Sequence, residues 1–462
     1  MSLTSVIAPR PTEATTGKER GSALLATLCF AAVLSLSLSS YLAVCYRSLY
    51  LSNRDLQSTR SIQLAETGME EAIWALTNST WTGWTISGST ATKTMTGFTF
   101  ENGASGQITL SVANYNLTTA SFTATNTPQV TLTAAGKITL ADGSILTRTL
   151  QSTARPAPLF SNAIGATSDL AFTSGGIVDS YDSSVGAYSA PDPAHLTAAN
   201  SAAVVAGATV DLGNVQVYGF ATTDGTALQN QSAAKVIGPN TPVGTNLDPA
   251  RISTAGSLPV FDLVTPVGGT VVYDPNGGDS TLTHSYSLNS PGVYRIFSIN
   301  LAGSEVLTIN ASNVVLVVTD RLRTRESGGI TVSSGASLQV FIADSNQGDS
   351  RRQLDLQGAG IINVSQSPQN VSIVGLGHSD SGASSRLAQT NPFFGTVYLP
   401  NDNVDISNNF AGFGALVGKR VTFSSASPFS GTTPLFHFDT ALRRIGISGV
   451  NTPFSLVMLR EI

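Results

Sequence analysis

The segment KERGSALLATLCFAAVLSLSLSSYLAVCY, from Lys18 to Tyr46, decides how the rest of the chain is placed. It carries no charge over the 24 residues from Ser22 to Cys45. As a helix these residues would extend about 36 Å, enough to cross a hydrocarbon core of about 30 Å. A cleavable secretion signal has a shorter apolar core of about 7–15 residues, followed by a break. The segment therefore predicts a membrane-spanning helix.

No break follows this segment. The next stretch, YRSLYLSNRDLQSTRSIQLAETGMEEAIWALTN, has no proline and no glycine before Gly68. We therefore expect one helix from about Ser22 to Thr77, roughly 80 Å long, with an apolar half and an amphipathic half. The amphipathic half is indicated by apolar residues at helical spacing, namely Ile62, Ala65, Met69, Ala72, Ile73 and Leu76.

The leader KERG at 18–21, the uncharged helix that follows the glycine, and AETGMEEAIWAL near the helix end together resemble type IV pilin-like proteins. Within these, the N-terminus is most similar to PilX-like minor pilins and large minor pseudopilins of type II secretion. The resemblance covers about residues 15–78. It implies that a prepilin peptidase cuts after Gly21, so that Ser22 becomes the first residue. It also implies a single-pass helix in the inner membrane that later contacts other pilin or pseudopilin subunits.

One position departs from the major subunits of that family. Major pilins carry a glutamate at the fifth mature position, where its carboxylate can neutralise a neighbour's N-terminal amine. Ala26 stands there in this sequence. Several minor pilins that initiate or cap a filament also lack this glutamate, so the resemblance implies a minor subunit at the tip. An uncut signal anchor with a long stalk is the alternative.

Residues 79–157 predict a small antiparallel sheet, as in a pilin head. WTGW at 81–84 closes the helix, and several segments of alternating apolar and polar residues follow. The turn signal ADGS at 141–144 separates two such segments and predicts a hairpin.

Residues 158–446 have a different sequence pattern, with short β-rich runs and no helical periodicity. Several runs start about 8–10 residues apart, with Gly, Asn, Asp and Ser between them, which favours a right-handed parallel β-helix. The segments 173–190 and 207–220 are predicted to form its first coils. A β-sandwich is the alternative, because no strict repeat is visible.

The expected fold class is therefore α+β: a long N-terminal helix with a small antiparallel sheet, followed by a mainly-β solenoid. VDSYDSS, GTVYLPN, GALVGK and HFDTAL within 160–445 also resemble a β-helical domain of unknown function that PilX-like proteins carry. The expected boundaries are 1–21 for the leader, 22–78 for the helix, 79–157 for the sheet, 158–446 for the solenoid, and 447–462 for a strand that caps or docks on the body.

The composition excludes several functions. Charged residues make up 11% of the 462, the net charge is −5, and no run of Lys and Arg occurs, so nucleic acid is not an expected partner. The only cysteines, Cys29 and Cys45, lie in the apolar segment, and the four histidines lack ligand spacing. We therefore expect no metal and no cofactor. The charge-poor, hydroxyl-rich remainder suits a periplasmic or extracellular domain.

The densest carboxylate group is Asp179 and Asp182 in VDSYDSS, flanked by Asp169 and Asp192. Asp179 and Asp182 are candidates to contact an ion or a glycan, or to act as an acid/base pair on a polysaccharide. The alternative is a network of Asx turns at a corner of a coil, where Asp and Ser bond local backbone amides.

Three further groups have a simple structural alternative. His437 lies two residues before Asp439, but no GxSxG nucleophile elbow accompanies them, so we expect the histidine to hold the last coil through backbone bonds. DSNQGDSRR at 344–352 is either a ligand-binding loop or an exposed loop. Around the helix end, either ion pairs at i, i+4 or lateral contacts with another subunit would use Arg54, Arg60, Glu66, Glu70 and Glu71.

The sequence thus predicts a non-enzymatic minor pilin or pseudopilin, with no catalytic residue. It would display a β-helical domain that primes assembly or contacts a surface glycan or secreted protein. The alternatives are a membrane-anchored β-helical polysaccharide lyase or hydrolase using Asp179 or Asp182, and a passive surface-anchored β-helix.

Overall fold

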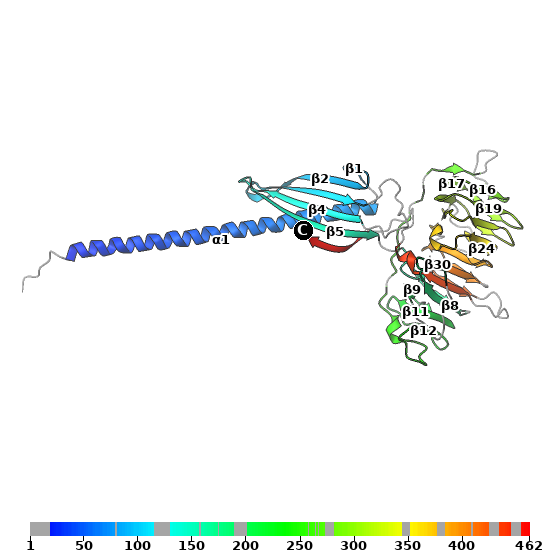
Figure 1. The fold of residues 1–462 in the computed structure, drawn as a ribbon. Coiled ribbons are helices and arrows are strands. Elements are labelled where there is room, and N and C mark those ends of the chain that lie inside the picture. The colour runs from blue at the N-terminus through cyan, green and yellow to red at the C-terminus, as the bar shows by residue number, and fades with distance from the viewer. Residues whose placement is uncertain are drawn as a thin grey trace, which may run out of the picture.

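A long helix, a small antiparallel sheet and a larger parallel-stranded body make up this computed structural model (Figure 1). The sheet lies along the second half of the helix, and the body lies beyond it, away from the free end of the helix. The predicted α+β class is confirmed. The structure describes residues 19–78, 81–114, 130–156, 159–173, 175–188, 201–256, 258–263, 265–266, 268–272, 281–343, 352–376, 384–407, 410–424, 434–444 and 454–462.

The helix α1 (Glu19–Asn78) has 60 residues and is about 90 Å long. Its ends lie within three residues of those predicted. The large apolar side chains from Leu24 to Leu51 are each at least 53% exposed, and Figure 1 shows the first half of the helix extending beyond the sheet and the body. The second half instead buries one stripe against the sheet, including Leu64, Met69 and Leu76. The two predicted halves of the helix are therefore distinct in their packing.

The antiparallel sheet has six strands in the order β1-β2-β3-β4-β5-β33. β4 and β5 are joined by the turn Leu140–Ser144, where Asp142 accepts a hydrogen bond from the Ser144 amide at 2.8 Å, so the predicted hairpin is confirmed. The strands are β1 (Thr85–Ser87), β2 (Thr90–Thr99), β3 (Ser105–Ala113), β4 (Val130–Thr139), β5 (Ile145–Pro156) and β33 (Phe454–Glu461).

Two glycines allow the helix to lie close against this sheet. A Cβ atom on Gly136 of β4 would lie 2.0 Å from the carbonyl oxygen of Ser61, and one on Gly68 would lie 2.4 Å from Leu110. The Ser61 hydroxyl donates to the Gly136 carbonyl at 3.2 Å. Helix and sheet thus meet backbone to backbone at this point.

The C-terminal strand β33 differs from its predicted position. We expected it to cap or dock on the solenoid body, but it pairs antiparallel with β5 of the small sheet. The physical reason is that β5 would otherwise leave a row of unpaired N–H and C=O groups at the sheet edge. The chain therefore returns from the body to the sheet that it left.

The body consists of parallel sheets. In the described residues, every ladder between named strands from β6 (Ile164–Ala166) to β32 (Leu435–Asp439) is parallel, unlike the antiparallel sheets of a β-sandwich. Nine strands form one sheet: β10 (Val210–Asp211), β7 (Leu170–Phe172), β31 (Val421–Ser424), β29 (Val404–Ser407), β27 (Ser385–Gln389), β24 (Leu354–Gly358), β21 (Leu322–Thr324), β18 (Ser298–Leu301) and β15 (Thr281–Leu282).

Two further sheets complete the body. Four strands form the smaller one: β16 (Tyr286–Leu288), β19 (Val306–Ile309), β22 (Gly329–Val332) and β25 (Gly360–Asn363). Fourteen strands form the larger one: β14 (Thr270–Val271), β17 (Gly292–Ile296), β20 (Val314–Val318), β23 (Leu338–Ile342), β26 (Val371–Gly375), β28 (Phe393–Leu399), β30 (Ala411–Gly418), β32, β8 (Gly176–Tyr181), β11 (Val215–Thr223), β9 (Ala202–Ala206), β6, β12 (Lys235–Ile237) and β13 (Ile252–Ser253).

The chain visits these sheets in a fixed rotation from β16 to β27. It passes from the four-stranded to the fourteen-stranded to the nine-stranded sheet, so each strand pairs with strands one circuit away. β19 and β20 start eight residues apart, within the spacing of β-rich runs that the sequence shows. Side chains facing inward from the sheets, mostly Val, Leu, Ile and Phe, form one continuous core.

The first strands of the body along the chain lie next to the last ones. β7 pairs with β31, and β8 pairs with β32, so the predicted first coils stack at the end of the body opposite β14. The chain must then return from β13 to β14, ten strand steps and about 48 Å away. The 17 Cα–Cα steps from Ser253 to Thr270 can span at most about 60 Å, which is enough for this distance. The Phe261 amide anchors it by donating to the buried Tyr398 hydroxyl at 2.7 Å.

Candidate functional site

The chain enters and leaves the body at neighbouring strands, which we call the seam. The long strand β30 pairs with β32 over Ala411–Gly414 and with β6 over Leu416–Gly418. β6 is the first strand of the body and β32 the last, so both connections to the antiparallel sheet start here. β32 then pairs with β8, which carries the VDSYDSS segment.

A row of side chains crosses the seam on the outer face of the sheet. Phe394, Phe413, His437 and Asp179 lie in register on β28, β30, β32 and β8. The Phe394 and Phe413 rings are stacked with centroids 4.4 Å apart, and the Phe413 and His437 rings lie 4.6 Å apart. Both phenylalanines are half-buried, whereas His437 and Asp179 are buried.

The Asp179 carboxylate is fully engaged at the end of this row. One oxygen lies 2.5 Å from His437 Nδ1, and the other accepts a hydrogen bond from the Tyr188 hydroxyl at 2.7 Å. The Tyr188 ring also covers the imidazole, with centroids 4.0 Å apart. Burial, together with the hydrogen bond to Asp179, raises the pKa of Tyr188, so its hydroxyl remains a donor.

Asp182 and Asp439 have separate local roles. Asp182 accepts from the Ser184 amide at 3.0 Å, which is the Asx turn given above as the alternative to a site. Asp439 accepts from the Ser183 amide at 3.0 Å and its hydroxyl at 2.6 Å. The hydroxyl of Ser183 therefore bonds to Asp439 and not to His437, and the arrangement is not a Ser/His/Asp triad.

The remaining predicted carboxylates lie away from this cluster. Asp169 accepts from the Thr209 hydroxyl at 2.6 Å and from Arg420 at 2.8 Å, at a corner of the body. Asp192 lies outside the described residues, as do residues 344–351 of the DSNQGDSRR segment. Among the described residues, no group of three or more His, Cys, Asp or Glu could hold a metal ion.

The Asp179–His437 pair joins two strands that are 258 residues apart in the chain. Chemically, a carboxylate on Nδ1 fixes the orientation of an imidazole. Both oxygens of Asp179 are occupied, however, and the side chain is fully buried, so it is not presented to a ligand. The pair and Tyr188 hold the seam closed, and Phe394, Phe413 and Tyr188 are half-buried aromatic groups at this site.

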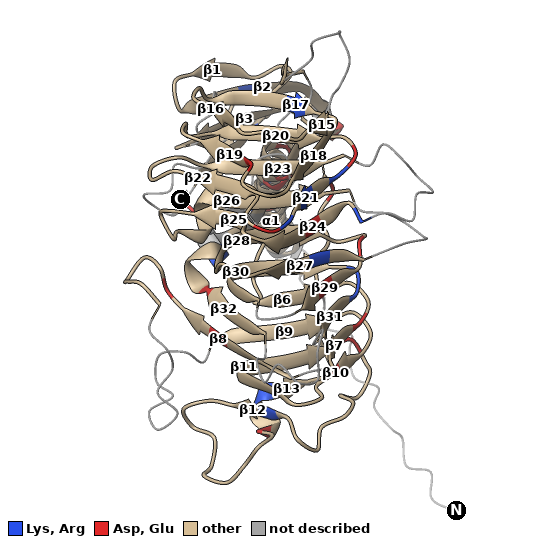
Figure 2. Cartoon of the chain, turned by 90° about the vertical axis from the view of Figure 1, so that its right-hand side faces the viewer, with Lys and Arg blue, Asp and Glu red and all other residues tan. Residues whose placement is uncertain are grey.

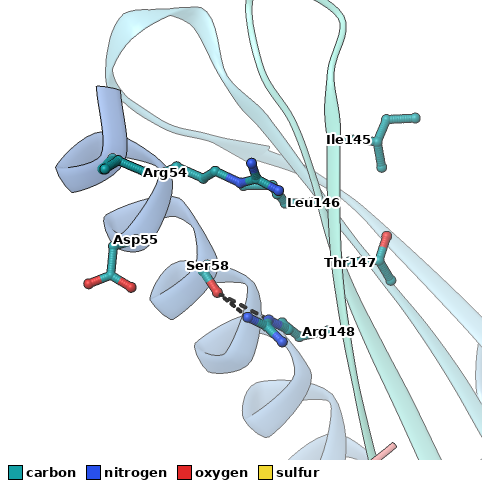
Figure 3. Close-up of a pocket in the computed structure, with 8 residues that line it drawn as sticks. Arg54, Asp55, Ser58, Ile145, Leu146, Thr147 and Arg148 are labelled. Atoms are coloured by element: carbon teal, nitrogen blue, oxygen red, sulfur yellow. Dashed lines mark hydrogen bonds between the residues drawn. The ribbon is translucent and has the colours of Figure 1, made fainter. Parts of the chain in front are cut away.

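A pocket of about 500 Å³ lies where the helix leaves the antiparallel sheet (Figure 3). Arg148 lies in its wall, and its Nε and Nη2 donate to the Ser58 hydroxyl at 3.1 and 2.9 Å. Its Nη1 pairs with Glu461 at 3.0 Å. One arginine thus ties α1, β5 and β33 together. The other residues lining the pocket are Leu51, Arg54, Asp55, Ile145, Leu146 and Thr147.

The charged residues of the helix end do not pair within the helix. Glu71 pairs with Lys93 of β2 at 2.6 Å, and Arg60 lies 4.0 Å from Glu101. The i, i+4 alternative is therefore wrong for these two residues. Glu66 and Glu70 are exposed and make no hydrogen bond or ion pair within the described part of the chain.

The predicted cleavage point lies at the start of α1. Gly21 and Ser22 fall within its first turn, since the helix begins at Glu19. Cleavage there would require this turn to unwind, which is the least costly place because the first amides of a helix lack intrahelical partners. Processing after Gly21 stays a prediction.

Comparison with known proteins gives one match to a family model, over part of the chain. Residues 270–445 match a domain of unknown function, DUF7305, which begins at β14 and ends just after the 3-10 helix η4 (Thr440–Arg444). No curated protein matches the chain. Among solved structures, it is similar to the competence-associated pilin ComZ from Thermus thermophilus at 11% identity, covering 87% of this chain and 97% of that one, with a TM-score of 0.24. A TM-score of this size does not establish a shared fold.

Proposed function

We propose that this protein is a minor pilin-like subunit that displays a β-helical domain on a membrane-anchored helix. The observation that carries the proposal is the division of α1. Its exposed apolar half extends alone, and its second half is packed on an antiparallel sheet (Figure 1). The helix α1 thus joins an exposed apolar segment, which is suited to lipid, to a folded unit made of its second half and the antiparallel sheet.

The exposed apolar half of α1 must be shielded from water. Fifteen or more large apolar side chains in water would be far above what a soluble chain leaves exposed. The helix is long and apolar enough to cross a membrane. We propose that it lies in the inner membrane as a single pass and that helices of other pilin or pseudopilin subunits replace the lipid on assembly. Glu66 and Glu70 are available on the same helix for such lateral contacts.

We further propose that the three parallel sheets form a right-handed β-helix. The fixed rotation of the chain through them supports this proposal. The body lies at the end of the molecule remote from the free helix (Figure 1). Such a broad body at the leading end is most easily accommodated where no subunit precedes it, and Ala26 in place of the glutamate of major pilins agrees with a tip position.

The proposed role is display without catalysis. The body would be periplasmic before assembly and extracellular after it, and would contact a surface glycan or a secreted protein. The half-buried Phe394 and Phe413 rings support contact with a sugar ring, since aromatic faces present flat apolar surface beside polar groups. A polysaccharide lyase or hydrolase is disfavoured because Asp179 is buried and occupied, whereas Asp182 serves a local turn.

Mass spectrometry of the N-terminus tests this proposal. We would express the full chain with and without a prepilin peptidase. We expect a mature chain beginning at Ser22 only when the peptidase is present. Gly21→Val should block processing, because the peptidase of this family cuts after a glycine and the variant places a branched side chain at that position. Gly17→Val, in the same leader, is the matched control and should be processed normally.

Two outcomes would contradict the proposal. An intact Met1 in the presence of the peptidase would indicate an uncut anchor, and cleavage beyond Ala43 would indicate ordinary secretion. In either case the helix would not enter a filament through the pilin route.

A further inference from the structure

A line of charged side chains runs along the outer face of the nine-stranded sheet. In Figure 2 they follow the edge that carries β21, β24, β27 and β29. Arg323, Asp355, Arg386 and Asp405 lie in register on these four strands, so opposite charges alternate along one column. Only 11% of the chain is charged, so such a column is a distinct local feature.

Asp355 has no free hydrogen-bonding capacity in this column. The side chain is buried, and its Oδ1 accepts from Arg386 Nε at 2.9 Å while Oδ2 accepts from Arg386 Nη2 at 3.3 Å. Gln357 Nε2 donates to the same two oxygens at 2.9 and 3.0 Å. A carboxylate offers about four acceptor positions, so this one is saturated.

Two more arginines approach the same carboxylate without bonding to it. Arg323 Nε and Arg325 Nη2 lie 3.7 and 3.9 Å from Asp355 Oδ2, beyond hydrogen-bonding distance, and neither guanidinium donates a hydrogen bond in the described part of the chain. Arg323 Nε is also buried with no hydrogen-bond partner. Burying such a donor is unfavourable unless something accepts from it.

The local charge is therefore unbalanced. Arg323, Arg325 and Arg386 surround the single carboxylate of Asp355, which leaves two positive charges in excess. Arg323 and Arg325 are two residues apart on an extended segment, so their side chains leave the same face. Arg325 is 46% exposed, so the pair can be reached from solvent.

We propose that Arg323 and Arg325 bind a carboxylate group of an acidic glycan. The planar guanidinium fork matches the two oxygens of a carboxylate, and a ligand carboxylate would supply acceptors to the solvent-facing donors of two guanidinium groups that donate to nothing in the described part of the chain. The neighbouring positions are amides, with Asn300 in register with Arg323 and Gln357 beside Asp355, and amides suit sugar hydroxyls. The site does not depend on the pilin-like role proposed above.

Calorimetric titration of the full chain in detergent tests the proposal. The probes are a uronate tetrasaccharide, a neutral tetrasaccharide of the same linkage, and a hexaglutamate peptide. We expect the uronate to bind and the neutral sugar to bind at least tenfold more weakly. Arg325→Gln should weaken uronate binding at least tenfold, and Arg323→Gln should do the same.

The matched control is Arg420→Gln on the same sheet, whose guanidinium already bonds to Asp169 and whose loss should leave the affinity within twofold. Arg325 is half-exposed, so its variant should keep the far-UV circular dichroism of the parent. Equal affinity of the parent and Arg325→Gln for the uronate would overturn the site. Hexaglutamate binding as tightly as the uronate, or more tightly, would overturn the glycan as ligand. Failure of processing at Gly21 would leave this result unchanged.

Discussion

Asp169 shows how a single carboxylate can stabilise a corner of the body. Its hydrogen bond from the Thr209 hydroxyl, followed by the bond from Arg420, lowers its pKa from 3.8 to about 2, against the opposing effect of burial. A pKa that is lower in the folded state stabilises the fold above the unfolded pKa, and the contribution is lost as pH falls through the folded pKa.

We therefore expect Asp169→Asn to lower the free energy of unfolding of the body by about 1 kcal/mol at pH 7, after allowing for solvent screening of a partly exposed pair. The difference from the parent should shrink between about pH 4 and pH 2 and vanish below it. Thermal midpoints followed by far-UV circular dichroism at a series of pH values measure this. A difference that persisted unchanged at pH 2 would contradict the assignment to the ionised carboxylate.

The residues at the seam show what the sequence could predict of the site. Asp179 and His437 are both candidates on the sequence alone, but nothing local in the sequence indicates that strands 258 residues apart lie side by side. Tyr188, Phe394 and Phe413 were missed for the same reason, since their contacts depend on register between distant strands. The arginines of the column, by contrast, have a local signal in the sequence. Arg321, Arg323 and Arg325 alternate, which places them on one face of a strand.

At the scale of elements, the contact between α1 and β4 depends on the absence of a side chain at Gly136. A methyl group there would meet the Ser61 carbonyl oxygen, which belongs to helix backbone and cannot move aside. We expect Gly136→Ala to destabilise the helix–sheet module, which consists of the second half of α1 and the antiparallel sheet, by about 1–3 kcal/mol, the usual cost of overpacking.

Tryptophan fluorescence during urea unfolding measures this change without interference from the body. All three tryptophans, Trp74, Trp81 and Trp84, lie in α1 or directly after it. Gly186→Ala is the matched control, because that glycine is exposed and a Cβ there meets nothing within 4 Å. An unfolding midpoint for Gly136→Ala equal to that of the control would show that the helix is not packed so closely.

The type of most elements could be predicted from local pattern, but their arrangement could not. Apolar spacing predicts α1 because one helix face is read from residues close in sequence. The ADGS turn predicts the β4–β5 hairpin for the same reason. β33 was predicted as a strand, yet its partner depends on which sheet has an open edge, and no property of residues 454–461 specifies that.

At the scale of the whole molecule, the two connections at the seam predict that the body can be separated from its anchor. Its core is distinct from the core of the helix–sheet module, and its first and last strands pair with strands of the body itself. We expect residues 159–444 alone to be soluble and to unfold cooperatively, with a thermal midpoint within a few degrees of that of the body in the full chain.

The control for this separation is residues 270–445, the stretch that matches the DUF7305 family. Without β6, β7 and β8, this piece would leave β30, β31 and β32 with open edges, and we expect it to aggregate. Size-exclusion chromatography and circular dichroism distinguish the two pieces. A stable 270–445 fragment beside an aggregated 159–444 fragment would contradict the interpretation of residues 159–256 as an integral part of the body.

The seam also determines how the protein would carry a mechanical load. If the body is held by a partner while the helix is pulled, the force passes through two covalent connections that leave the body at adjacent strands. One leads to β5, which continues into the sheet, and the other to β33, whose first residue Phe454 lies opposite Pro156 at the end of β5. Tension would act along the length of β33, so that its hydrogen bonds to β5 are strained together and do not peel open one by one. β33 would thus be a second connection that carries load between the body and the antiparallel sheet, beside the covalent connection to β5.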